Sequence, residues 1–124
     1  EYNTNRNALF IGGLPCLIDF LTNEFNLNGG LRPEIKSDST STIVSFTIDK
    51  DGNVIEPKIE STTGNKGLEN EALRVVSLTN NKWIPAISGG AIVNSIYRIH
   101  FFIIEKKLSD TYKQFKIGYK PIFD

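Results

Sequence analysis

The sequence predicts an α+β domain in which two helices cover one face of a three-stranded, antiparallel-type sheet. Residues 42–60 alternate between apolar and polar side chains on either side of a turn, which is typical of a β-hairpin. Residues 14–25 and 68–79 repeat apolar positions at helical spacing. Residues 91–105 alternate again and predict a third strand. A length of 124 residues suits a single domain.

The overall composition excludes several classes of function. With 14 basic and 14 acidic residues the formal net charge is zero, so the chain has no broad attraction for nucleic acid or an anionic membrane. The one cysteine, Cys16, excludes an internal disulfide, and in its apolar run we expect it to be a small buried side chain. No apolar run approaches the roughly 18–20 residues of a membrane span. Because the chain starts at Glu1 and contains no methionine, we expect a processed or trimmed piece.

The first helix is predicted from about Leu14 to Phe25. Gly12 and Gly13 end a short apolar run before it, and Pro15 suits the first turn of a helix. One apolar stripe follows at helical spacing, formed by Leu14, Leu17, Ile18, Leu21 and Phe25. Residues 31–41, with a proline and several serines and threonines, predict a loop.

The hairpin is the clearest local signal in the chain. Val44, Phe46 and Ile48 fall on one face of its first strand. Residues 49–53 supply turn chemistry, because a glycine tolerates positive φ and the Asp and Asn side chains bond nearby backbone. The second strand then runs from Val54 to about residue 60.

The second helix and the third strand complete the predicted fold. The helix runs from about Leu68 to Thr79 and cannot extend through Pro85. Residues 88–90 predict a turn, and Ala91 to Glu105 predict one long strand. One face of that strand carries Tyr97, Ile99, Phe101 and Ile103, and the other carries Ile96, Arg98, His100, Phe102 and Ile104.

The position of Pro57 sets the expected order of the strands. Proline has no amide hydrogen to donate, so the strand that contains Pro57 belongs at an edge of the sheet. The third strand must then pair with the first, which gives the order 2-1-3 with both helices on one face. This order leaves the third strand as an open edge.

Several segments together resemble a known family. They are Ser45–Val54, Leu68–Val76, Trp83–Ala86 with Gly89 and Gly90, and Tyr97–Phe101. In order and spacing they resemble the C-terminal domain of TonB energy transducers. Phe10–Gly13 before a short helix resembles the lead-in of TonB-like proteins of the Bacteroidetes type. The resemblance covers about residues 10–104, which makes 105–124 an extension of a single domain, 1–124.

The resemblance implies a periplasmic protein–protein interaction domain. In the family, the domain binds a short extended peptide of an outer-membrane transporter, the TonB box, and energy from the inner membrane is transmitted through this contact to drive transport. The parent protein is then anchored in the inner membrane by a segment that this chain lacks, together with a Pro-rich spacer. The absence of that segment and spacer is one departure from the family pattern. A second is that Gly30–Pro33 stands where the family usually has an aromatic–proline pair.

The candidate partner-binding site is the open edge of the third strand. Its unpaired backbone groups would be satisfied by an extended peptide through β-augmentation. The residues of this edge are Asn94, Ser95, Ile96, Tyr97, Arg98, Ile99, His100, Phe101, Phe102, Ile103 and Ile104. The alternative is a stand-alone structural or assembly module that self-pairs through this edge into a homodimer, or whose edge is covered by its own chain.

The extension bears directly on that alternative. Residues 112–119 alternate in the manner of a strand, with basic and aromatic residues interleaved. They predict either a fourth strand that folds onto the open edge or a mobile tail. Contact with nucleic acid or a membrane surface is disfavoured, because the run holds few lysines and the chain is neutral.

We expect no enzymatic activity, no cofactor and no metal. The single histidine, His100, excludes a histidine-based metal cluster, and no Ser-His-Asp set or phosphate-binding loop can be assembled. Asp49, Asp51 and Asn53 have the spacing of a calcium loop, but Val54 stands where that loop requires glycine. Trp83 is expected to fill the core between the second helix and the sheet.

Overall fold

Two helices and eight strands make up the part of the chain that the structure describes. The structure is a computed structural model, and it describes residues 5–26, 40–107, 109 and 113–122. The elements are β1 (Leu9–Phe10), α1 (Leu14–Glu24), β2 (Ser41–Ile48), β3 (Val54–Thr62), α2 (Lys66–Leu78), β4 (Trp83–Ile84), β5 (Ala86–Ser88), β6 (Ala91–Val93), β7 (Ser95–Lys107) and β8 (Lys113–Ile122). Most of the loop predicted at 31–41, and the Gly30–Pro33 stretch, lie outside the described residues.

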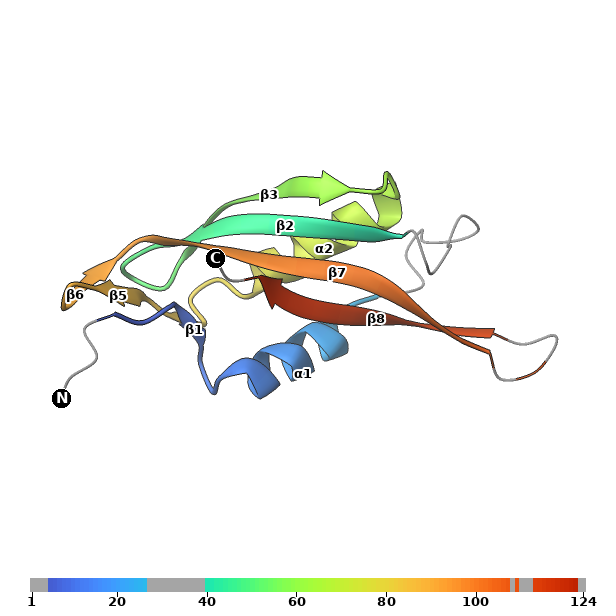
Figure 1. The fold of residues 1–124 in the computed structure, drawn as a ribbon, viewed down its shortest axis with the longest axis horizontal. Coiled ribbons are helices and arrows are strands. Elements are labelled where there is room, and N and C mark those ends of the chain that lie inside the picture. The colour runs from blue at the N-terminus through green and yellow to red at the C-terminus, as the bar shows by residue number, and fades with distance from the viewer. Residues whose placement is uncertain (1–4, 27–39, 108, 110–112, 123–124) are drawn as a thin grey trace.

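The main sheet has four strands in the order β3-β2-β7-β8, and each neighbouring pair is antiparallel (Figure 1). The predicted three-stranded sheet is therefore wrong, because β8, from the extension, adds a fourth strand. β2 lies between β3 and β7, and β3 is an edge strand, as the missing amide of Pro57 requires. β1 with β4 and β5 with β6 form two small two-stranded sheets.

Both helices pack on one face of the main sheet, as predicted. The sheet contributes the buried side chains Val44, Phe46, Ile48, Tyr97, Ile99, Phe101 and Ile103, and the helices contribute Leu17, Leu21, Leu68, Ala72, Val75 and Val76. Trp83 is 3% exposed within the same core, and its indole N–H donates to the Thr79 hydroxyl at 2.9 Å. The expectation that Trp83 is a core residue is confirmed.

The β2–β3 hairpin forms where it was predicted, and Asp49 organises its turn. Its carboxylate accepts the backbone N–H groups of Asp51 and Asn53, both at 2.9 Å, and the Asn53 side-chain amide at 3.1 Å. These hydrogen bonds, with the Asn53 backbone bond first, lower the pKa of Asp49. Gly52 has a φ of 83°, and a Cβ there would collide with the Trp83 carbonyl oxygen. The residues with calcium-like spacing therefore serve the turn.

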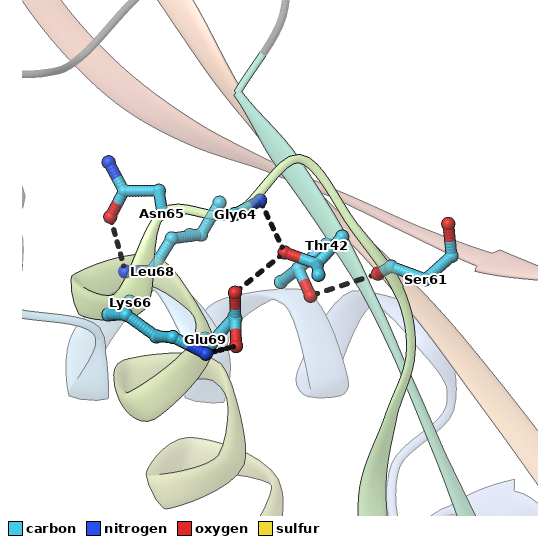
Figure 2. A network of polar contacts seen from close by, with 8 residues as sticks. Thr42, Ser61, Gly64, Asn65, Lys66, Leu68 and Glu69 are labelled. Atoms are coloured by element: carbon cyan, nitrogen blue, oxygen red, sulfur yellow. Dashed lines mark hydrogen bonds and ion pairs between the residues drawn. The ribbon is translucent and has the colours of Figure 1, made fainter.

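A polar network fixes the start of α2 against the end of β3 (Figure 2). α2 begins at Lys66, before the predicted Leu68, because the Asn65 side chain accepts the N–H of Leu68 at 3.0 Å. Glu69 is 7% exposed, accepts the Thr62 hydroxyl at 2.9 Å and lies 3.4 Å from the Lys66 Nζ. A buried carboxylate with these partners ties the helix to the sheet.

Two predictions about individual residues and strands are wrong. The strand predicted at 91–105 is interrupted at Asn94, because β6 pairs with β5 whereas β7 pairs with β2. Cys16 is exposed rather than buried, since the buried residues of α1 are Leu17 and Leu21.

Candidate functional site

β7 has a neighbouring strand on each side over most of its length. On one side, Ser95–Phe102 pair with β2. On the other side, Arg98–Lys107 pair with β8, so that Arg98 lies opposite Ile122 and Lys107 opposite Lys113. The expectation of an open edge is therefore wrong from Arg98 onward, and the extension forms a fourth strand on that edge. That a partner binds Asn94–Ile104 stays a prediction.

The predicted edge residues divide between the two faces of the sheet. Tyr97, Ile99, Phe101 and Ile103 are buried in the core beneath the helices. Ile96, Arg98, His100, Phe102 and Ile104 alternate with them, and among these Ile96 is 62% exposed. Asn94 is exposed just before β7, and Ser95 is the first residue of the strand. The side chains of this stretch that are open to solvent therefore lie on the face without helices.

Arg98 and His100 are the basic residues of the predicted edge. Arg98 donates from Nε to the Glu60 carboxylate at 2.9 Å and so links β7 to β3 across β2. The ring of His100 lies 5.2 Å from that of Phe102. Burial, and then the positive charge of Lys120 on β8, lower the pKa of His100. The lowered pKa favours the neutral imidazole, and His100 lies on the face of the sheet without helices.

Gly118 and Tyr119 hold β8 in place. Gly118 lies opposite Phe102, and a Cβ at Gly118 would collide with the Phe102 ring. The Tyr119 ring packs 5.6 Å from that of Phe101 and 6.2 Å from that of Phe25. Its hydroxyl donates to the Leu21 carbonyl of α1 at 3.1 Å, and burial raises the pKa of Tyr119 to about 12. β8 is thus joined to both the sheet and α1.

The backbone of β7 shows which groups of β8 point toward the sheet. Ile103 donates its N–H to the Thr40 carbonyl at 3.2 Å, in line with the β2–β7 register. Backbone bonding alternates along an antiparallel ladder, so the odd-numbered residues of β7 bond to β2 and the even-numbered residues bond to β8.

The same alternation leaves half of the β8 backbone directed away from the sheet. Gly118 and Lys120 lie opposite even-numbered β7 residues, so their N–H and C=O groups face β7. Those of Ile117 and Tyr119 face outward. Pro121, which has no N–H to donate, occupies another outward position, as is usual for an edge strand. Among the described strands, β8 is thus the edge on this side of the sheet.

A groove of about 370 Å³ lies between β8 and α1. Its walls include Ile18 and Thr22 of α1, Phe25 at the end of that helix, and Ile117 and Tyr119 of β8. Figure 1 shows α1 running below β8 at this border of the domain. The groove therefore combines an apolar wall with an outward-facing strand backbone.

The opposite border of the sheet is irregular. The β2–β3 register shifts twice, between Ile43 and Val44 and between Ser45 and Thr47. Glu56 on β3 has a φ of 51°, which is unusual for a residue other than glycine, and Pro57 follows it. Bulges, charge and proline are features that prevent strand addition, so β3 is a poor edge for a peptide.

Comparison with protein families identifies the domain. The family described as the Gram-negative bacterial TonB protein C-terminal matches residues 37–103, more than half of the 124 residues. The chain belongs to the TonB C-terminal domain family. No curated protein and no solved structure matches it.

The family to which this TonB C-terminal domain belongs has a characteristic cellular location and a characteristic class of partner. Domains of the family are periplasmic and interact with TonB-dependent outer-membrane transporters as part of energy transduction. No helix among the described residues is long and apolar enough to cross a membrane. Within the same residues, no three His, Cys, Asp or Glu side chains gather in a way that could hold a metal ion.

The family match stops short of both walls of the groove. It begins just before β2 and ends within β7, so α1 and β8 of this TonB C-terminal domain lie outside it. The groove residues Ile18, Thr22, Ile117, Gly118 and Tyr119 were not among the site residues predicted from the sequence. The alternation at 112–119 was the available signal, and Gly118 within it was the second, because glycine inside a strand marks a close approach.

Proposed function

We propose that this domain binds an extended peptide of a TonB-dependent outer-membrane transporter in the periplasm by β-augmentation, and so couples energy to transport. The role is one of binding rather than catalysis. Family membership supports the class of partner. The observation that carries the mechanism is the regular β7–β8 side of the sheet, where the register runs from Arg98 to Lys107 without a shift. An added strand needs such a regular edge.

Two positions on this side could take the peptide. Addition along Asn94–Ile104, which spans most of β7, requires β8 to leave from Arg98 onward, because β8 already pairs there. Addition to the outer side of β8 leaves the sheet intact. In either case each backbone hydrogen bond contributes about 0.5–1.5 kcal/mol net. A five- or six-residue strand then reaches roughly micromolar affinity after the cost of ordering.

The test is a titration of the isotopically labelled domain with a synthetic transporter peptide that contains the TonB box. We expect the amide signals of β7 and β8 to shift and those of β3 to stay in place. A peptide of the same composition in scrambled order is the control. No shift along β7 or β8 at millimolar peptide would contradict the proposal.

A second candidate is a stand-alone structural module whose edge is sealed by its own C-terminal strand. The contacts of Tyr119 with α1 and of Gly118 with Phe102 favour it, because they make β8 an integral part of the fold. Ending the chain after Lys107 would distinguish the candidates. Under capture at β7, the shortened chain binds the transporter peptide more tightly than the full chain. If instead β8 permanently seals the edge, the shortened chain loses stability and gains no affinity for the peptide.

Self-pairing of two copies through this side of the sheet is the remaining alternative. It would make the mass measured by sedimentation rise with protein concentration. The transporter peptide would then compete with dimer formation, because both need the same backbone groups. A constant monomer mass over a wide concentration range would exclude this alternative.

A further inference from the structure

Only part of the apolar surface of α1 is buried in the core. Leu17 and Leu21 are buried against the sheet. Leu14 is 47% exposed, and Ile18 lies one helical turn further along the same face. Ile18 also lines the groove beside β8. Leu14 lines a separate pocket with Phe10 and Tyr97, so of these two residues Ile18 is the one that brings apolar surface of α1 to the groove beside β8.

The outward backbone of β8 defines what chemistry fits beside this apolar surface of α1. The N–H and C=O groups of Ile117 and Tyr119 face away from β7, at alternate positions along the strand. An extended chain presents donors and acceptors at the same spacing, whereas a helix or a lipid tail does not. The groove thus offers backbone pairing on one wall and apolar contact on the other, which is the arrangement of a β-augmentation site.

We infer that the groove between β8 and α1 is the docking site of an extended acidic peptide, which adds as a fifth strand and leaves β8 in place. The inference rests on the proposed peptide capture and assigns it a position and a sequence preference. The peptide side chains that point to the helices meet Ile18 and Phe25 and must be apolar. The alternate side chains point to the opposite face of the sheet.

The positive charge on β8 determines which residues are favoured at the peptide positions that point to the face without helices. β8 contains no acidic residue, and its Lys120 lies opposite His100 of β7. Lys120 is exposed and lies close enough to His100 to lower its pKa, which places its charge on the face without helices. Acidic side chains on that face of the peptide complement this charge. The preferred sequence therefore alternates apolar and acidic residues.

The contacts of β8 with the rest of the domain favour a peptide that adds to the outer side of β8 over a peptide that displaces β8 from β7. Tyr119 donates to the Leu21 carbonyl and packs on Phe101 and Phe25. A peptide that displaced β8 would have to replace these contacts and also the close fit of Gly118 to Phe102. A peptide that adds to β8 keeps all of them.

The test uses the full chain, isotopically labelled, and a capped heptapeptide in which glutamate and valine alternate. We expect the amide signals of Ile117 and Tyr119 to shift and their hydrogen exchange to slow on binding. The amides of Gly118 and Lys120, which face β7, stay protected throughout. A heptapeptide that is N-methylated at every residue keeps the side chains but cannot donate backbone hydrogen bonds, and we expect it not to bind.

Two matched variants test the helical wall. Ile18→Glu places a charge on the α1 wall of the groove, and we expect it to weaken heptapeptide binding about tenfold, since the apolar contact is lost. Leu78→Glu is the control, because Leu78 is an apolar residue, 42% exposed, at the end of α2 and does not line the groove. The control should change the affinity by less than about twofold. Both folds are checked by their amide spectra.

Each contrary outcome has a distinct meaning. Loss of protection at Gly118 and Lys120 together with shifts along β7 would show that the peptide replaces β8. That result would support peptide binding by the domain and would contradict the addition of a fifth strand to β8. Equal binding of a lysine–valine heptapeptide would overturn the acidic preference, and equal loss in both variants would overturn the helical wall. Binding of the glutamate–valine probe at Ile117 and Tyr119 without binding of the transporter peptide would support the groove and overturn the transporter as its partner.

Discussion

The ring of Phe102 on β7 occupies the space where any side chain at Gly118 on β8 would begin. This fit sets the register of β8. A slip of one residue would turn every β8 side chain to the other face, and a slip of two would place Lys116 or Lys120 opposite the ring. An aromatic ring over a cross-strand glycine is also a known means of stabilising a glycine within a sheet. The pair therefore decides which backbone groups of β8 face outward.

Substitution at Gly118 should loosen the β7–β8 pairing. We expect Gly118→Ala to lower the free energy of unfolding by about 1–3 kcal/mol, because the methyl group overpacks against Phe102. Urea denaturation measures this change. In a Phe102→Ala background the cost of Gly118→Ala should fall toward zero, since the obstructing ring is gone. An equal cost in both backgrounds would show that the two residues are not coupled.

Hydrogen exchange in the free domain should alternate along β8. The amides of Ile117 and Tyr119 should exchange quickly, whereas those of Gly118 and Lys120, which face β7, should be protected. The measurement is residue-resolved exchange at neutral pH. Uniform protection along β8 would mean that its outer side is already covered, and uniform fast exchange would mean that β8 is detached from β7.

The domain should lose stability in alkali. Burial raises the pKa of both Tyr97 and Tyr119 to about 12, from an ordinary value near 10. Between these values the folded state keeps protons that the unfolded state has released, so the stabilisation is complete below pH 10 and is lost as the pH rises toward 12. Denaturation midpoints measured across this interval should therefore fall.

The Tyr119→Phe variant separates the two tyrosines. It should make the alkaline decline less steep, and at neutral pH it should cost about 0.5–1.5 kcal/mol because the bond to the Leu21 carbonyl is lost. A pH profile that matches that of the unsubstituted domain would mean that Tyr119 titrates normally.

The start of α2 should depend on the Asn65 side chain. Asn65→Ala removes the acceptor of the Leu68 N–H, and we expect it to cost about 1 kcal/mol in the free energy of unfolding. Asn70→Ala is the control, because Asn70 is exposed within the same helix and alanine has the higher helix propensity. Thermal denaturation of both variants should show a loss for the first and no loss for the second.

The sequence was most informative where structure is set by neighbouring residues. The β2–β3 hairpin was predictable because Asp49, Gly52 and Asn53 supply the turn themselves. The edge position of β3 followed from Pro57, which lacks a donor. The core face of β7 followed from the alternation that includes Phe101 and Ile103. Each of these features depends on chemistry within a short segment.

The sequence was less informative where two alternating segments compete for partners. The alternation from Ala91 to Glu105 does not reveal that the pairing changes at Asn94. The pattern at 112–119 was compatible with a strand or a tail. The choice depends on contacts made only in the folded domain, above all those of Gly118 with Phe102 and of Tyr119 with Leu21. The groove could not be predicted because one of its walls, β8, depends on that choice, although the helix that forms the other wall was predicted.

Pro121 also bears on how the protein remains dispersed in solution. Because the formal net charge is zero, copies of this chain are not kept apart by overall repulsion. An outward strand edge in such a molecule favours edge-to-edge pairing with a second copy and aggregation. Pro121 interrupts the outward row of donors at the end of β8, and the charge of the exposed Lys120 opposes the approach of a second, identical edge. Pro121 therefore limits how far a partner strand can extend along β8, and it also opposes self-association of the protein through that edge.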